Sequence, residues 1–265
     1  MLKRRFGPAE VPVIGQGTWK LHGKEAVDAL RVGIDLGLTH IDTAELYGTE
    51  EMVGEAIEGH RDEVFLVSKV LPSNATRKGT VRACEQSLKR LRTDLLDCYL
   101  LHWPGEHPLE DTIAAFEELR AQGKIRSYGV SNFDEDLLEQ AVRIAGPGRI
   151  ACDQVLYSLS ERHSEARVLL KCREVGAVMV GYSPFHGLPD RGELLKVALE
   201  LRATTRQVAL AFLTRLPDTF AIPKASRVAH ARENAGAATL TLTEEQIARL
   251  DRAYPIRIRP ELPVI

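Results

Sequence analysis

Short apolar runs alternate with longer helical patterns along almost the whole chain, and this alternation restricts the possible folds more than any other feature. Eight apolar runs occur, at residues 11–17, 39–42, 64–70, 95–102, 125–131, 150–157, 177–183 and 219–224. Helical spacing of apolar residues occurs at 24–36, 49–58, 76–92, 109–121, 134–145, 162–174, 192–214, 226–236 and 241–253. Eight strands, each followed by a helix, predict an α/β protein with the (β/α)8 TIM barrel fold.

A doubly wound parallel sheet is the alternative that has the same order of elements. Such a sheet usually carries a G-x-G-x-x-G turn after its first strand. Here the first run ends in Gly15-Gln16-Gly17, and the third glycine would fall on Lys20. The fingerprint fails, and no linker or low-complexity tract divides the chain. We therefore expect one barrel domain over residues 1–265.

Composition and charge narrow the class of protein further. A chain of 265 residues with 44% hydrophobic residues is long enough for a large core. The formal net charge of -2 gives no basic excess, so we expect neither nucleic acid nor membrane as a partner. No apolar run approaches the length of a membrane span. We expect a cytoplasmic monomer, with reduced and mostly buried thiols at Cys84, Cys98, Cys152 and Cys172.

Polar residues stand where three successive strands end. Asp42 ends the second expected strand, Lys69 lies near the end of the third, and His102 ends the fourth. Tyr47 follows on the loop after the second strand. Because the carboxyl ends of barrel strands form one rim, these four side chains should meet there.

Their chemistry predicts a proton relay for a carbonyl or an alcohol. Asp42 would keep Lys69 charged, Lys69 would lower the pKa of Tyr47, and His102 would hydrogen-bond the substrate oxygen. Taken alone, each of these residues also has a non-catalytic interpretation. A lone lysine late in a strand, for example, is usually a solvated residue of the rim. The sequence has no H-E-x-x-H pattern and no clustered histidines, so we expect no metal site.

The later strand exits suggest a place for a second reactant. The amides of Asn132 and Gln154 can hold a carboxamide, and the ring of Tyr182 can stack on a flat ring. A basic cluster follows the last strand, where a helix N-terminus also favours anions. Its members are Lys224, Ser226, Arg227 and Arg232. A solvated basic face is the alternative reading of this cluster.

At this point the sequence resembles the aldo-keto reductase family. The segments "IGQGTW", "HIDTAELYG", "VSKV", "LLHWP", "IRSYGVSNF", "DQVLYS", "GYSPF" and "IPKASRVAHAREN" follow the family's order and spacing. The resemblance implies a (β/α)8 barrel, NADPH as cofactor and reduction of a small carbonyl substrate. It implies a catalytic tetrad of Asp42, Tyr47, Lys69 and His102, with a substrate pocket formed by Trp19, Tyr47, His102 and Trp103. The cofactor contacts that it implies are Gly17, Thr18, Trp19, Asp42, Ser131, Asn132, Gln154, Tyr182, Ser183, Pro184, Phe185, Leu188, Pro223, Lys224, Ala225, Ser226, Arg227, Arg232, Glu233 and Asn234.

Two positions depart from the family pattern. Ala225 stands where the family often has serine or threonine, and His230 stands where it commonly has arginine. Both bear on the preference for NADPH over NADH rather than on the cofactor class. If His230 meets the 2′-phosphate, NADPH affinity should weaken between about pH 6 and pH 8.

The loops after the fourth and seventh strands are short, which favours an open site. We expect small or medium aldehydes and ketones as substrates, including 2-oxoaldehydes such as methylglyoxal. The tail "YPIRIRPELPVI" could pack across either the barrel or the pocket rim. Two alternatives to a reductase stay open: a non-catalytic NADP(H) sensor, and a Schiff-base enzyme that uses Lys69 as nucleophile.

Overall fold

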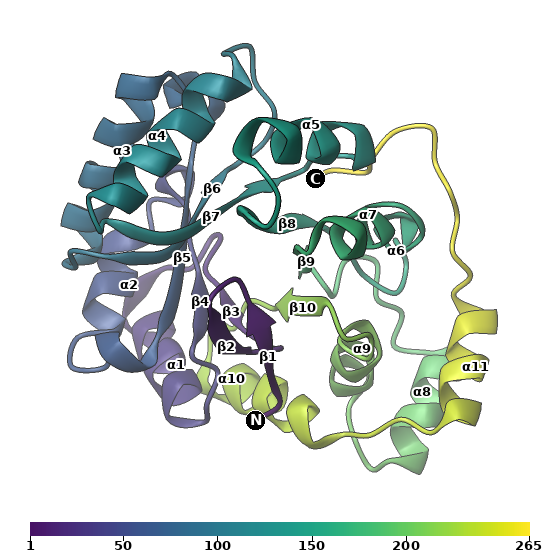
Figure 1. Cartoon of the computed structure of the whole chain (residues 1–265). Helices are drawn as coiled ribbons and strands as arrows, with labels where there is room; N and C mark the ends of the chain where they lie inside the picture. The colour runs from purple at the N-terminus through teal and green to yellow at the C-terminus, as the bar shows by residue number, and fades with distance from the viewer.

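Eight parallel strands form the centre of the structure, a computed structural model that describes residues 1–265 (Figure 1). In spatial order they are β10 (Thr219–Ile222), β9 (Val178–Tyr182), β8 (Ile150–Leu156), β7 (Ile125–Ser131), β6 (Leu96–Leu101), β5 (Phe65–Val70), β4 (His40–Asp42) and β3 (Gln16–Gly17). The two ends of this order also meet, because the amide of Gly15 donates to Ala221 O at 2.8 Å and that of Gly17 to Pro223 O at 3.1 Å. The sheet is therefore closed, and the expected (β/α)8 barrel is confirmed.

Helices surround the barrel and connect its strands (Figure 1). They are α1 (Gly23–Asp35), α2 (Glu50–Ala56), α3 (Arg77–Leu91), α4 (Leu109–Ala121), α5 (Glu135–Ala145), α6 (His163–Ala166), α7 (Val168–Val175), α8 (Gly192–Glu200), α9 (Thr205–Leu213), α10 (Val228–Gly236) and α11 (Glu244–Ala253). Short 3-10 turns occur at η1 (Glu45–Tyr47), η2 (Arg61–Glu63), η3 (Pro72–Asn74) and η4 (Ala237–Thr239).

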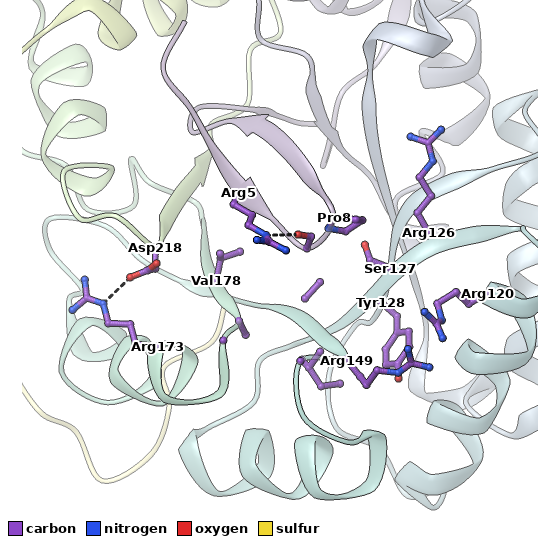
Figure 2. A pocket seen from close by; sticks show the side chains of 16 residues that line it. Arg5, Pro8, Arg120, Arg126, Ser127, Tyr128, Arg149, Arg173, Val178 and Asp218 are labelled. Carbon is purple, nitrogen blue, oxygen red and sulfur yellow. Dashed lines mark hydrogen bonds and ion pairs between the residues drawn. The ribbon is translucent and has the colours of Figure 1, made fainter.

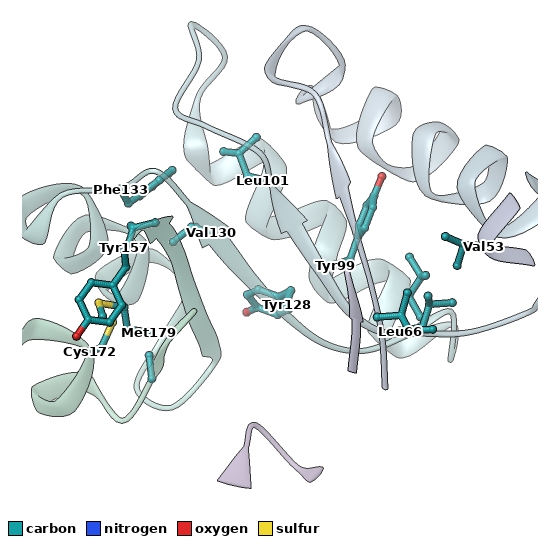
Figure 3. Close-up of a cluster of buried hydrophobic side chains, with 14 of the residues drawn as sticks. Val53, Leu66, Tyr99, Leu101, Tyr128, Val130, Phe133, Tyr157, Cys172 and Met179 are labelled. Atoms are coloured by element: carbon teal, nitrogen blue, oxygen red, sulfur yellow. The ribbon is translucent and has the colours of Figure 1, made fainter. Parts of the chain in front are cut away.

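Successive strand residues belong to two different hydrophobic layers, because side chains alternate between the faces of a strand. In β6, Cys98 and Leu100 belong to the smaller core, whereas Tyr99 and Leu101 belong to the larger one. Figure 3 shows the larger layer, where Tyr99 and Leu66 pack between the strands and the helices. The strands are buried on both faces, which explains their nearly continuous apolar sequence.

The strand expected at residues 11–17 is wrong. An antiparallel hairpin of β1 (Lys3–Phe6) and β2 (Ala9–Pro12) comes first, and the first barrel strand contains only Gln16 and Gly17. The hairpin turns at Gly7, whose φ of +55° suits glycine. Its buried Phe6 packs against His40 and two phenylalanines at ring-centroid distances of 4.8 to 5.7 Å. The hairpin thereby closes the end of the barrel where the strands begin.

The single helix expected at 192–214 is also wrong, since α8 and α9 are separate. Arg202 between them has a φ of 51°, which a continuing helix cannot accommodate. Thr204 then starts α9 with a capping box, in which its hydroxyl accepts from the Gln207 amide and the Gln207 side chain accepts from the Thr204 amide. The expected helix at 162–174 is likewise divided, into α6 and α7.

The Gly15-Gln16-Gly17 segment has a packing role at the closure of the barrel. A Cβ atom on Gly15 would lie 2.7 Å from His40 O, and one on Gly17 would lie 2.7 Å from Ile222 O. Neither position therefore has room for a side chain.

All four cysteines are free and buried, as expected. None of the helices has the length and apolarity that crossing a membrane requires.

Candidate active site

The four predicted relay residues lie together at the end of the barrel where the strands finish. Lys69 Nζ lies 2.6 Å from Asp42 Oδ1, 2.9 Å from Thr43 O and 3.4 Å from the Tyr47 hydroxyl. The same hydroxyl is 3.4 Å from His102 Nε2. The side chains thus form a continuous line from a buried carboxylate to an imidazole, with the phenol between lysine and histidine.

Lys69 is fully buried, yet its surroundings favour the charged ammonium. Burial alone would lower the pKa of Lys69, but the carboxylate of Asp42 and the phenol of Tyr47 raise that pKa above its ordinary value. A charged amine is not a nucleophile, because its lone pair carries a proton. The pairing with Asp42 therefore argues against the Schiff-base alternative.

The expected lowering of the Tyr47 pKa does not occur in the free enzyme. Burial raises the pKa of Tyr47 above its ordinary value, and Lys69 opposes this effect without overcoming it. The sequence indicated the lysine but not the extent of burial around the phenol. Tyr47 is consequently neutral at neutral pH and can donate a proton.

His102 is a neutral imidazole in this site. Burial, with a further contribution from the charge on Lys69, lowers the pKa of His102 to about 3. Its Nδ1 is buried without a hydrogen-bond partner, while Nε2 faces Tyr47. The imidazole can therefore offer a hydrogen bond to an oxygen without adding a positive charge.

The amide side chains from later strands are connected to this relay. Gln154 donates from Nε2 to Asp42 Oδ2 at 2.7 Å, so both carboxylate oxygens of Asp42 are engaged. Asn132 donates to His102 O at 3.0 Å and accepts from the Tyr182 hydroxyl at 2.8 Å. Burial raises the pKa of Tyr182 to about 12, so this phenol keeps its proton and stays a donor.

A cavity of ≈ 450 Å³ opens above these side chains. Most of the expected pocket and cofactor residues line it: Gly17, Thr18, Trp19, Asp42, Tyr47, His102, Trp103, Ser131, Asn132, Gln154, Tyr182, Ser183, Pro184, Phe185 and Lys224. Lys69 is fully buried and is not among the lining residues. The tryptophans Trp19 and Trp103 are about 40% exposed, at 42% and 38%, so their rings are available to a ligand.

Five lining residues were not anticipated from the sequence: Leu46, His186, Arg206, Ile222 and Ile265. Leu46 immediately precedes Tyr47, so its proximity could have been inferred. Arg206 lies with its guanidinium 5.0 Å from the Phe185 ring centroid, and only the tertiary fold brings it there. Ile265 answers the open question about the tail, which reaches the pocket rim.

The remaining predicted cofactor residues lie outside this cavity: Leu188, Pro223, Ala225, Ser226, Arg227, Arg232, Glu233 and Asn234. Leu188 lies in the loop between β9 and α8, whereas the others flank Lys224 at the cavity edge and continue into α10. Lys224, Ser226 and Arg227 are exposed, whereas Asn234 is buried. Arg227 Nη2 lies 2.9 Å from His230 Nε2, and since a guanidinium only donates, His230 accepts there.

Comparison with known proteins places this geometry in a family. The model of the "Aldo/keto reductase family" matches residues 13–255. This chain belongs to the aldo/keto reductase family. The methylglyoxal reductase YeaE of Escherichia coli is 43% identical over 94% of this chain and 93% of its own length. The glyoxal reductase of Bacillus subtilis is 34% identical over 91% of this chain and 88% of its own length.

Solved aldo/keto reductases have the same fold. A crystal structure of an aldo/keto reductase from Klebsiella pneumoniae in complex with NADP and acetate has a TM-score of 0.95 and 44% identity, covering 100% of this chain and 99% of that chain. A complex with NADPH of an aldo-keto reductase from the same organism has a TM-score of 0.94 at 44% identity, covering 100% of both chains.

Proposed function

We propose that this aldo/keto reductase reduces small and medium-sized aldehydes and ketones to alcohols, with NADPH as the reductant. The observation that carries the proposal is the line Asp42–Lys69–Tyr47–His102 beneath an open cavity. This arrangement places a neutral phenol and a neutral imidazole beside the same space. NADPH-linked reduction also agrees with the Klebsiella pneumoniae complexes with NADP and NADPH.

The residues of the chain then have distinct tasks. When bound, NADPH supplies a hydride to the carbonyl carbon. Tyr47 gives its proton to the carbonyl oxygen, so that the alcohol forms and a phenolate remains. Lys69, 3.4 Å from that hydroxyl, stabilises the phenolate by its charge, and Asp42 holds Lys69 in place. His102 directs the carbonyl oxygen by hydrogen bonding through Nε2.

The cofactor-binding residues fit the chemistry of NADPH. The ring of Tyr182 and the amides of Asn132 and Gln154 line the cavity, where they suit a flat carboxamide-bearing ring. Exposed Arg227 stands at the N-cap position of α10, where the helix N-terminus adds to the attraction for phosphate, and exposed Lys224 lies in the segment just before it. We assign nicotinamide binding to the first group and phosphate binding to the second.

For the substrate we propose a 2-oxoaldehyde such as methylglyoxal. Trp19 and Trp103 flank an open cavity that can admit small carbonyl compounds without a tight enclosure. The names of the relatives from Escherichia coli and Bacillus subtilis agree with this class. The monomeric state and the cytoplasmic location stay predictions, and analytical ultracentrifugation checks the first.

A screen of NADPH oxidation across aldehydes, ketones and dicarbonyls tests the proposed activity, with NADH measured in parallel. We expect turnover with 2-oxoaldehydes and a higher kcat/KM with NADPH than with NADH. Tight NADPH binding without turnover of any carbonyl compound would instead support the sensor alternative.

A further inference from the structure

A second cavity lies at the opposite end of the barrel from the candidate active site. It opens between the β1–β2 turn and the starts of β7, β8 and β9, and its volume is ≈ 670 Å³ (Figure 2). We call it the arginine hollow. The charged members of its lining are Arg5, Arg120, Arg126, Arg149, Arg173 and Asp218.

The lining is strongly cationic, although the chain as a whole has a formal net charge of -2. Five of the lining residues are arginines, and the only acidic one is Asp218. Arg173 already occupies that carboxylate, at 2.9 Å from Nε to Oδ2. In Figure 2, Arg5 reaches from the hairpin toward the strand starts, with Arg149 and Arg120 on one side and Arg173 on the other.

The acids behind the lining are each divided between two arginines. Glu117 accepts from both Arg120, at 3.1 Å, and Arg149, at 2.5 Å. Because each guanidinium has several N–H donors and one full charge, one carboxylate cannot satisfy two of them. Positive charge therefore remains on this side of the hollow.

Asp97 is divided in the same way on the β7 side. It accepts from Arg126 at 2.8 Å and from Arg61 at 2.9 Å. The Arg126 side chain is still 58% exposed despite this contact. Exposed Arg5 makes no ion pair: its one side-chain hydrogen bond runs from Nε to Gly7 O at 3.2 Å, and the carboxylate of Glu10, its cross-strand neighbour in the hairpin, is not bonded to it. Arg5 and Arg126 therefore have donors available for a ligand.

We propose that the arginine hollow binds a small phosphorylated anion with more than one negative charge. A guanidinium matches the planar, two-point geometry of a phosphate group better than an ammonium does. Guanidiniums on several sides of one hollow suit a compact multivalent anion, whereas an extended polymer would need a continuous basic track. A network that only ties α4 to β7 and β8 would explain Arg120 and Arg149, but Arg5 belongs to the hairpin and takes no part in that network.

Isothermal titration calorimetry of the enzyme saturated with NADP⁺ tests the proposal, because the cofactor then blocks the phosphate contacts near α10. Inorganic pyrophosphate is the probe, and adenosine 5′-diphosphate in a parallel titration distinguishes an oligophosphate site from a nucleotide site. We expect one saturable site for pyrophosphate. Its Kd should rise when salt goes from about 0.01 M to about 0.1 M, since the screening length falls from about 30 Å to about 10 Å.

Two variants and a matched control decide the location of that site. Arg5→Gln and Arg126→Gln should each raise the pyrophosphate Kd about tenfold, and the double variant should raise it further. Arg82→Gln removes an exposed arginine of α3 that has no ion pair, so it should leave the Kd unchanged. NADPH oxidation with a good carbonyl substrate should stay at the wild-type rate in all four variants, the double variant included, and show that they fold. The proposal is overturned if saturable binding is absent, or if the double variant binds pyrophosphate as tightly as Arg82→Gln does.

Discussion

At the scale of single residues, opposing effects around Tyr47 decide what the site can do. Burial raises the pKa of this phenol, while the ammonium of Lys69 opposes that rise from 3.4 Å away. Tyr47 is therefore protonated at neutral pH. Once it has donated its proton, the charge on Lys69 stabilises the phenolate that remains. Such a group suits the donation of a proton during carbonyl reduction.

The pH dependence of turnover follows from these directions. Tyr47 must be protonated to act as the acid, and its raised pKa keeps it so past the ordinary tyrosine value of about 10. His102, with a pKa of about 3, stays neutral throughout. We expect kcat for reduction at saturating NADPH to be flat from about pH 6 to about pH 10 and to fall only above that. A steep fall of kcat near neutral pH would show that a different group supplies the proton.

Cofactor preference can be tested at Arg227. This exposed residue precedes α10, and its guanidinium uses only one nitrogen, Nη2, in its contact with His230. Its other N–H groups are available to a 2′-phosphate. Losing one charge-assisted hydrogen bond costs about 1.5–3 kcal/mol, or about a tenfold to hundredfold weaker Kd. We expect Arg227→Ala to weaken NADPH by that factor and to leave the Kd of NADH, which lacks the phosphate, unchanged. Equal weakening of both cofactors would place Arg227 elsewhere in the site.

At the scale of secondary-structure elements, the β1–β2 hairpin packs on the barrel at the end opposite the catalytic residues. Its Phe6 is 1% exposed and covers the end of the barrel where the strands begin, opposite the relay. The hairpin is therefore expected to affect stability and to leave the chemistry unaltered.

Replacing Phe6 by alanine should remove most of this contact. We expect Phe6→Ala to lower the free energy of unfolding by about 3–5 kcal/mol, measured by urea denaturation. Lys3→Ala, at an exposed position of the same strand, should change it by less than about 0.5 kcal/mol. KM for NADPH should match the wild type in both variants. A Phe6→Ala protein as stable as Lys3→Ala would mean that the hairpin does not support the barrel.

At the scale of the whole molecule, a buried histidine couples folding to pH. His40 is fully buried among Phe6, Phe65 and Phe220, and neither of its ring nitrogens has a hydrogen-bond partner. Burial, assisted by the charge on Lys69, lowers the pKa of His40 to about 3. Because the unfolded chain binds this proton at about pH 6.5, stability falls as the pH drops from that value toward about 3.

His40→Leu should therefore flatten the pH dependence of unfolding. From these two pKa values, protonation of His40 in the unfolded chain accounts for about 3 kcal/mol of lost stability between about pH 7 and pH 4. We expect wild type to lose about that much more than the variant over this range in urea titrations. Parallel losses in both proteins would show that His40 does not provide the coupling.

The architecture of the barrel and the composition of the relay could be predicted from the sequence, because both follow from the order of strands and helices along the chain. Strand exits meet at one rim in any (β/α)8 barrel, so Asp42, Lys69 and His102 could be placed together before any coordinates. The hairpin was not predicted, because residues 11 and 12 of β2 run directly into the apolar stretch that was expected as a whole to form the first barrel strand. The break after α8 could have been found, because Thr204 and Gln207 have the spacing of a capping box.

The features that depend on the tertiary fold were not predictable. The pKa of Tyr47 depends on how many atoms surround the phenol, and the sequence indicated only its charged neighbour. Arg206 and Ile265 reach the cavity from elements distant along the chain. Ionic partners that distinguish the arginine hollow from an ordinary basic surface, such as Glu117 and Asp97, also come together only on folding.

The central claim is that Tyr47 donates the proton in carbonyl reduction, and Tyr47→Phe tests it most directly. Single-turnover oxidation of bound NADPH by a 2-oxoaldehyde measures the chemical step, and fluorescence titration measures NADPH affinity in the same variant. Loss of a positioned general acid typically reduces the rate by about 10²–10⁴. We predict a loss of that size with an unchanged NADPH Kd. A single-turnover rate within a few-fold of wild type would contradict the account.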